Sequence, residues 1–443
     1  RMGAQQRIQD QSLAVLLNNS KYVNRLPIGT EQVLKTFKPE TIRAFYKDWY
    51  RPDLQAVIIV GDIDPIAIET QIKKLFSDLK NPGKEKIRPN FDIALTGKNQ
   101  FKTITDAEVA QTTVDITIKF REHTNRTQTD FRKSLITSLF SSMFSSRLAE
   151  ASKRPDAPFD GLSGGYSKFM GGLDALSIEI LPKKGKIQNG FTSAWTITEG
   201  IKRNGFLTSE LDRAKMTLIS QMSAAVKEKD KQSSTSLADQ FKNLFLKGEA
   251  MPGIIFENTL MGKLLPGITL AEINTAAKTY LKSTDRDIII TAPIKEKAEL
   301  PGQAEINNWI LSVEKSSIPA YSENLLGGTL LSSLPAKGSI TSVKQIPEIG
   351  LTEWTLSNGA KVVIKPTDFK HDEISFLALS PGGTSLYSDA DYESAANAAG
   401  IISSFGLGKF DNIALPKLLS GKQLSLQPFI SERMEGLQGS SSV

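Results

Sequence analysis

The chain has 443 residues and a net charge of +6, with 40% hydrophobic and 23% charged residues. This composition excludes a disordered tail, and the length predicts about two to four domains. No apolar run is long enough to span a bilayer, and the basic residues are scattered among acids, which argues against a nucleic-acid partner. The absence of cysteine excludes disulfides, thiolate metal sites and cysteine nucleophiles, and is compatible with a bacterial periplasm.

The start of the chain is polar and helix-like and has no apolar signal core. Any targeting segment would therefore lie upstream of Arg1. We expect the sequence to begin inside a larger protein.

An internal repeat organises the first part of the chain. Residues 40–60 align without gaps on residues 271–291, and each copy is typical of a helix that leads into a strand. After the first copy, Asp64 followed by Pro65 predicts the start of another helix. The repeated unit is therefore expected to be helix, strand, helix.

Between the two copies, strand and helix patterns are mixed. The predicted strands are residues 113–120 and 176–181, and the predicted helices are residues 131–140 and 211–225. In the first strand, Asp115, Thr117 and Lys119 lie on the face opposite the apolar one. We expect an α+β fold, an antiparallel sheet with helices packed on one face, which residues 288–291 close.

The hydrophobic periodicity of the sequence is lost over residues 312–350, where prolines and paired glycines interrupt it. This pattern predicts an interdomain linker. A new unit follows, in which Asn358 and Gly359 form a hairpin turn into the strand 361–365. Residues 374–379 are expected to be the neighbour of that strand.

Only two histidines are present, His123 and His371. Each has charged or polar neighbours, and neither has a second histidine at the spacing of a zinc-binding helix. We interpret both as surface side chains. No catalytic residue, metal ligand or substrate-binding residue can be assigned from the sequence.

Three short motifs have a chemical and a structural interpretation. Residues 161–165 match the G-x-S-x-G nucleophile elbow around Ser163, but no buried strand precedes them, which favours a flexible glycine loop. Asp62 and Asp64 could hold magnesium, but Asp64 is better explained as a helix cap. The basic stretch 80–88 has prolines and no aromatic residues around it, which favours a solvated loop over a phosphate site.

Three segments together resemble the pitrilysin/insulinase family of zinc metallopeptidases. They are YVNRLPIGTE at residues 22–31, FYKDWYRPDL at 45–54 and VIIVGD at 57–62. Members of that family have four related α+β domains in two halves that close like a clamshell around a peptide. The fold implied is that of pitrilysin and the mitochondrial processing peptidase.

The resemblance implies a domain plan for the whole chain. Residues 1–95 are expected to be the second half of a first, catalytic-type domain, 98–310 a complete second domain, 312–350 the linker, and 351–443 the first half of a third, inactive-type domain. Residues 358–359, 380–383 and 406–410 are similar to the opening of the third domain in bacterial two-half proteins.

The family's chemistry uses an H-x-x-E-H helix and a later glutamate to bind zinc and activate water. None of these residues can be placed here. The helix that begins at Arg1 resembles the one that carries the third ligand, which is expected just before Arg1. Residues 395–403 occupy the position of the motif helix in the third domain and hold no histidine or glutamate, which indicates an inert half. Residues 145–148 echo the family's S-R-L motif, and here we favour a helix-packing role.

The resemblance therefore implies part of a zinc-dependent metalloendopeptidase that cleaves peptides or unfolded chains in a closed chamber. This segment would be inactive alone, with zinc bound only in the full-length parent, in the periplasm or cell envelope of a bacterium. The alternative is a non-catalytic peptide-binding or assembly subunit of the same fold, and the sequence leaves open whether this chain alone is an enzyme. The two incomplete end domains, 1–95 and 351–443, are expected to pair with each other or with a second chain.

Overall fold

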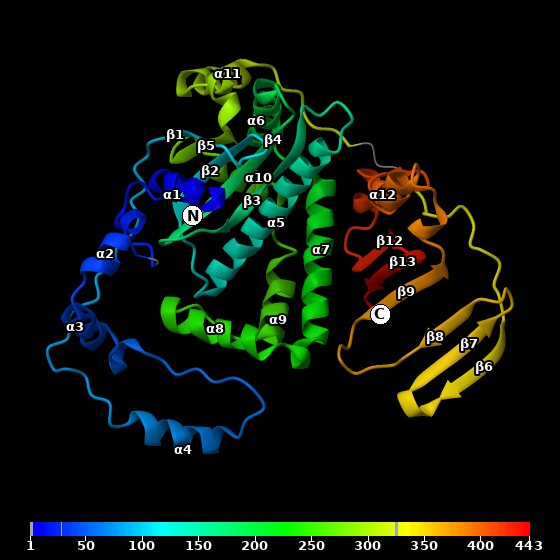
Figure 1. Cartoon of the computed structure of the whole chain (residues 1–443), viewed down its shortest axis with the longest axis horizontal. Coiled ribbons are helices and arrows are strands. Elements are labelled where there is room, and N and C mark those ends of the chain that lie inside the picture. Colours follow the sequence, from blue (N-terminus) through cyan, green and yellow to red (C-terminus); the bar gives the residue numbers. More distant parts are fainter. Residues whose placement is uncertain (1–2, 28, 324–326) are drawn as a thin grey trace. The chain divides into compact units, whose positions relative to one another are not determined.

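The structure is a computed structural model that describes residues 3–27, 29–323 and 327–443. Arg1 and Met2, where the first predicted helix begins, and residues 324–326 of the predicted linker lie outside the described residues. The chain divides into two units (Figure 1). The first contains the residues up to Leu211 and Ser233–Tyr321, and the second contains Asp212–Gln232 and Ser322–Val443.

The first unit is built on a five-stranded sheet with the strand order β1-β5-β2-β4-β3. The strands are β1 (Gln100–Asp106), β2 (Thr113–Arg121), β3 (Phe159–Lys168), β4 (Leu173–Pro182) and β5 (Arg286–Pro293). All neighbours pair antiparallel except β1 and β5, which are parallel. The predicted α+β fold is confirmed, and the three predicted strands lie in one sheet. β5 does not close that sheet, because β1 continues it on the outer side of β5.

Helices cover one face of this sheet. They include α5 (Gln128–Ser152), α6 (Ile187–Asn204), α9 (Ile254–Leu264), α10 (Leu270–Tyr280) and α11 (Gln303–Lys315). The ring of Tyr280 lies 5.5 Å from Phe120 of β2, 5.0 Å from Phe140 of α5 and 4.7 Å from Tyr166 of β3, measured between centroids. Each fully buried apolar side chain of this core contributes about 1.5–3 kcal/mol to folding.

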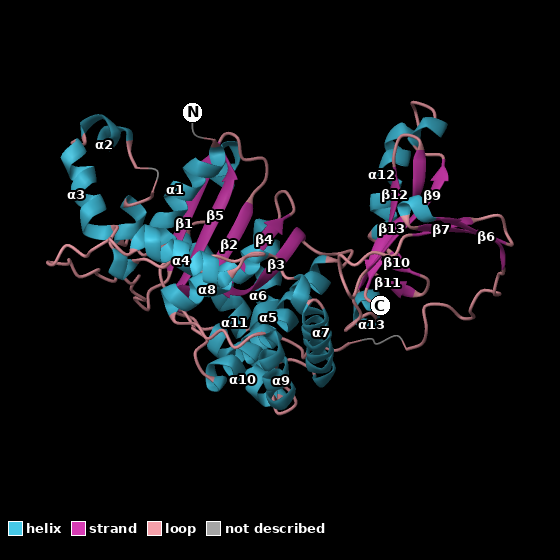
Figure 2. Cartoon of the chain, turned by 90° about the horizontal axis from the view of Figure 1, so that it is seen from below, coloured by secondary structure: helices cyan, strands magenta, loops and turns pink. Residues whose placement is uncertain are grey.

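Helix α1 (Ala4–Leu16) packs beside β1 on the other face of the sheet. Figure 2 shows it apart from α5, α6, α10 and α11. Leu13 and Leu17 form a second small core with Ile93 and Leu173. Because the end of α1 reaches over β2, Lys119 is only 1% exposed, although the alternation placed it on the polar face.

The remaining helices of the first unit are largely exposed. They are α2 (Glu31–Thr36), α3 (Pro39–Trp49), α4 (Pro65–Phe76) and α8 (Ser234–Lys247), and none has a buried residue. The predicted helices at 40–49 and after Asp64 are confirmed, but the strand expected at the end of residues 40–60, around residues 57–59, does not form. No described strand lies beside this segment, and a strand without a neighbour cannot satisfy its backbone groups.

Helix α7 (Thr208–Lys227) runs from the first unit into the second. The described residues of the second unit form three small sheets. One is β6 (Ile340–Ile346), β7 (Leu351–Leu356) and β8 (Lys361–Ile364); another is β12 (Leu424–Ile430), β13 (Met434–Ser441) and β9 (Ile374–Pro381); the third is β10 (Gly406–Leu407) with β11 (Phe410–Asp411). Helices α12 (Tyr392–Ser403) and α13 (Ala414–Leu418) complete it.

One strand pairing predicted for this region was wrong. Residues 374–379 form β9, which pairs with β13 and not with β8, because its partner comes from a distant part of the sequence. The predicted linker 312–350 is also partly structured. Helix α11 extends to Lys315, and β6 forms between Pro335 and Pro347, where no proline interrupts the ladder. The hairpin turn is confirmed: Gly359 has a φ of 85° and its N–H donates to the carbonyl of Leu356.

Candidate functional site

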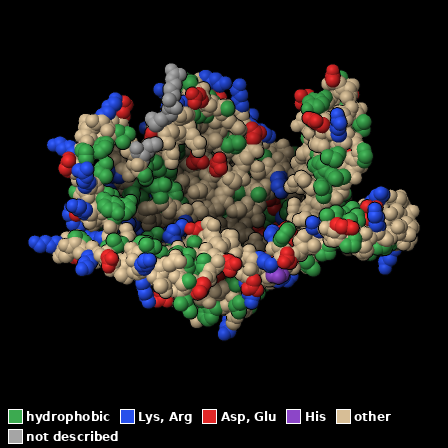
Figure 3. All heavy atoms as spheres, turned by 60° about the horizontal axis from the view of Figure 1, so that its bottom comes forward, with side chains coloured by type: hydrophobic (Ala, Val, Ile, Leu, Met, Phe, Trp, Pro, Cys, Tyr) green, Lys and Arg blue, Asp and Glu red, His purple; other side chains and the backbone are tan. Residues whose placement is uncertain are grey.

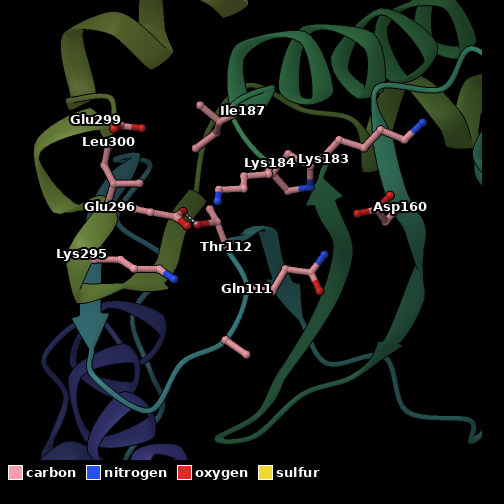
Figure 4. Close-up of a pocket in the computed structure, with 13 residues that line it drawn as sticks. Gln111, Thr112, Asp160, Lys183, Lys184, Ile187, Lys295, Glu296, Glu299 and Leu300 are labelled. Atoms are coloured by element: carbon pink, nitrogen blue, oxygen red, sulfur yellow. Dashed lines mark hydrogen bonds between the residues drawn. The ribbon is translucent and has the colours of Figure 1, made fainter.

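A cavity of about 610 Å³ lies at one end of the five-stranded sheet (Figure 4). Its walls come from the β1–β2 connection, the start of β3, the turn from β4 to α6, and the 3₁₀ helix after β5. The lining residues are Ala110, Gln111, Thr112, Asp160, Pro182, Lys183, Lys184, Gly185, Ile187, Lys295, Glu296, Glu299 and Leu300. No motif pointed to this cavity, because its residues come from four separate segments.

One hydrogen bond joins two walls of the cavity: the Thr112 hydroxyl donates to Oε2 of Glu296 at 2.7 Å. Lys184 points across the space toward this pair, whereas Lys183 points away from it (Figure 4). Gly185 makes the turn into α6 with a φ of 71°. The lining carries both charges but no histidine, so the cavity offers hydrogen bonds and ion pairs to a polar ligand.

The glycine-rich segment 161–165 is part of strand β3, so the predicted flexible loop was wrong. The glycines allow α5 to approach closely. A Cβ on Gly164 would stand 2.6 Å from the carbonyl oxygen of Ser177 and 2.8 Å from Leu148, and the Ser145 hydroxyl donates to the Gly164 carbonyl at 2.5 Å. Ser163 therefore lies in a regular strand, and the sharp turn of a nucleophile elbow is not formed.

The S-R-L segment at residues 145–148 has the helix-packing role that was predicted. The guanidinium of Arg147 donates to both carboxylate oxygens of Glu210, at 2.6 and 2.7 Å, and both side chains are buried. It also stacks on the ring of Tyr321 at 3.7 Å. This bidentate pair joins α5 to the first turn of α7.

The other residues singled out in the sequence do not form a common site. His123 is half-buried and its Nε2 lies 3.0 Å from the Asp130 carbonyl, whereas His371 is exposed in the second unit. Asp64 caps α4 by accepting from the N–H of Ile66 at 2.9 Å, and Asp62 is exposed beside it. Residues 80–88 form an exposed loop, as predicted. Among the described residues, no group of three or more acidic or histidine side chains could hold a metal ion.

One face of the sheet is not covered by α5, α6, α9, α10 and α11. On the strands of this face that α1 does not cover, the side chains are polar. Ser163, Ser177 and Glu179 are exposed on β3 and β4, and Asp115 of β2 lies directly opposite Glu179. Burial, together with the charge of Glu179, raises the pKa of Asp115 to about 6. A shallow hollow of about 340 Å³ lies where Ser163 and Glu179 meet the end of α5.

The segment that carries the family resemblance is exposed and apolar. Phe45 and Tyr46 of α3 are 57% and 60% exposed, and Val57 and Ile59 are nearly half exposed. Figure 3 shows apolar side chains gathered on this part of the molecule, at its left. Ile28 of the segment lies outside the described residues. These side chains have the pattern of a domain interior, but the described residues provide nothing to cover them.

Comparison with known proteins identifies relatives. The family described as "Peptidase M16 inactive domain" matches residues 36–218. The zinc protease PQQL-like of Arabidopsis thaliana is 28% identical over 423 residues, covering 95% of this chain and 41% of that protein. The fold is similar to the periplasmic protease PqqL from Escherichia coli, with a TM-score of 0.68, 20% identity, and coverage of 99% of this chain and 49% of that one.

A second solved structure is a mutant of the ferredoxin protease FusC in complex with Arabidopsis ferredoxin. It has a TM-score of 0.67 and 19% identity, and the match covers 100% of this chain and 49% of that one. The chain therefore spans about half the length of the curated relatives it matches. No described helix is long and apolar enough to cross a membrane.

Proposed function

We propose that the chain is a member of the pitrilysin/insulinase family of zinc metallopeptidases and forms part of the substrate chamber of a zinc-dependent endopeptidase. In this proposal residues 98–310 are the complete second domain, 1–95 and 351–443 belong to two neighbouring domains, and the linker lies within 312–350. The substrates are peptides or unfolded chains enclosed by the full-length protein. The ferredoxin bound by FusC supports a protein substrate.

The observation that carries this proposal is the asymmetry of the five-stranded sheet. Helices seal one face with an apolar core, whereas the other face presents Ser163, Ser177 and Glu179 to solvent. A sheet with one sealed and one open polar face suits the wall of a water-filled chamber. Its side chains would contact a peptide without carrying out the hydrolysis.

The described residues do not fit the zinc ion that the family implies, because they contain no group of ligands for it. We therefore assign no step of peptide hydrolysis to this chain, and expect it to be inactive alone. When bound in the parent, zinc would supply an activated water molecule. The exposed apolar side chains of α3, and Leu377 of β9, would be covered by other parts of the parent or by a second chain. We place the protein in the periplasm, as for the E. coli relative.

A version of the protein extended upstream through a complete first domain, and downstream through a fourth, tests the proposal. We expect it to cleave an unfolded peptide and to lose that activity with a chelator, while the present chain binds no zinc and cleaves nothing. The second candidate is a non-catalytic peptide-binding or assembly subunit, which the match to an "inactive domain" favours. Peptide binding by the extended protein without chelator-sensitive cleavage would establish that candidate instead.

A further inference from the structure

A buried polar group on the open face of the sheet holds the end of α1. Nζ of Lys119 on β2 lies 2.6 Å from Oδ2 of Asp287 on β5, and these side chains are 1% and 0% exposed. Gln100 of β1 donates to the other carboxylate oxygen of Asp287 at 3.2 Å. Three neighbouring strands thus contribute one polar side chain each to the same point.

The donors of this group are directed at the last turn of α1. Lys119 donates to the carbonyl of Leu16 at 3.2 Å, and Gln100 donates to the carbonyl of Val15 at 2.8 Å. Both also donate to Oδ1 of Asn18, each at 2.6 Å. The carbonyls at a helix end have no partner within the helix and carry partial negative charge, so a buried ammonium is well matched to them.

The backbone after α1 is bent to reach this group. Asn18 and Asn19 have φ values of 50° and 51°, in the left-handed region, which asparagine adopts more readily than most residues other than glycine. The amide of Asn18 also donates to the carbonyl of Ala94 at 2.5 Å. Lys119 and Gln100 therefore contact this turn through the side chain of Asn18.

Stability alone does not explain this group. Burial raises the pKa of Asp287 even with Lys119 beside it, so desolvation outweighs the ion pair. Buried ion pairs are often replaced by apolar pairs with no loss of stability. Leu13 and Leu17 already bury apolar surface against the sheet, but such contacts have no direction. The polar group, by contrast, fixes the angle of α1 relative to the strands and the position of its last turn along them.

We propose that Lys119, Asp287 and Gln100 are positioning residues, which set the direction of α1 on the sheet of the second domain. At the other end of the helix, Arg7 pairs with Asp106 at 2.7 Å, so both ends of α1 are tied to the same sheet. The inference rests on the proposed function, in which α1 belongs to the catalytic-type domain. The second domain then acts on that domain by orienting the helix.

The test replaces the ion pair by an apolar pair, K119M with D287L, which avoids leaving one buried charge alone. A gentler variant, Q100M, removes the amide that donates to Val15, Asn18 and Asp287 and keeps the ion pair. The matched control is K102M, because Lys102 is an exposed lysine on the same strand, two residues after Gln100. Hydrogen exchange is measured at the amides of α1 and of β2, together with the unfolding midpoint.

In the paired variant we expect the last-turn amides of α1 to exchange roughly 10- to 100-fold faster, the factor for losing a charged hydrogen bond. In Q100M, which loses neutral hydrogen bonds, we expect roughly 2- to 10-fold faster exchange. The β2 amides and the unfolding midpoint of the paired variant should not fall, and the control should match the wild type. Unchanged exchange in α1, or equal acceleration in α1 and β2, would overturn the inference.

The same variants in the full-length protein give a second readout. If α1 is mispositioned, kcat should fall while KM stays unchanged, since the substrate wall is intact. A rise in KM, or a fall in kcat that follows the loss of folded protein, would count against positioning. A full-length wild type without peptidase activity would refute the proposed function, and hydrogen exchange in α1 would still decide this inference on its own.

Discussion

Asp115 lies on the open face of the sheet, directly opposite Glu179 of the neighbouring strand. Burial and the charge of Glu179 raise the pKa of Asp115 from 3.8 to about 6, and a hydrogen bond with Thr113 offsets part of this increase. The substitution Asp115→Asn keeps the shape of the side chain and removes its charge. We therefore expect the variant to be more stable than the wild type at neutral pH.

The sign and size follow from proton linkage. An acid whose pKa is higher in the folded state binds more protons there between the two pKa values, so the free energy of unfolding falls as the pH rises through that window. For Asp115 the window runs from 3.8 to about 6. At about 1.4 kcal/mol per pKa unit, the buried charge costs at most about 3 kcal/mol above this window, and water around the exposed Glu179 lowers the cost to about 1–2 kcal/mol.

The assay is urea unfolding at a series of pH values from about 4 to about 8, followed at the amides of β2 so that only the first unit is observed. The stability difference between Asp115→Asn and the wild type should be near zero at the acidic end. It should reach its full value above the pKa of Asp115. Glu179→Gln should give a smaller gain of the same sign. A difference that is the same at every pH would refute the reasoning, because it would mean that Asp115 titrates normally.

Three further outcomes are expected. Glu210→Ala leaves the buried guanidinium of Arg147 without its partner and should lower the free energy of unfolding by about 3–5 kcal/mol; a loss below about 1 kcal/mol would show that the pair is dispensable. Gly164→Ala places a Cβ against the Ser177 carbonyl and should cost about 1–3 kcal/mol in chemical denaturation, whereas Gly262→Ala in α9, with open space around it, should stabilise by about 0.5–1 kcal/mol. Metal analysis of the present chain should find no stoichiometric zinc, and one tightly bound zinc per chain would contradict the proposed division of labour.

Local signals in the sequence were sufficient where neighbouring residues decide the outcome. Asp64 caps α4 because its carboxylate reaches amides only two and three residues away. The strict alternation in residues 113–120 appears as β2, and the turn at Asn358 and Gly359 joins β7 to β8. The absence of a zinc-type histidine pair was also visible, since it depends on sequence spacing alone.

Tertiary structure decided the features that depend on distant partners. The glycines of β3 predicted a loop, yet they lie in a strand. Their lack of side chains leaves the space in which α5 packs against that strand. Residues 57–59 have a strand pattern, but no strand lies beside them in the part of the chain that the structure describes, and β9 pairs with β13 from the far end of the chain. In each case the same local pattern is compatible with more than one packing or pairing partner. The pattern alone therefore cannot determine which structure forms.

Lys119 shows this division most clearly. By alternation, the sequence by itself determined which face of β2 the residue occupies. Only the packing of α1, a helix about one hundred residues earlier, decided that this face is buried there, and that the ammonium meets Asp287 and the carbonyl of Leu16 instead of water. Periodicity reports which side chains share a face, but burial of that face is a property of what lies against it.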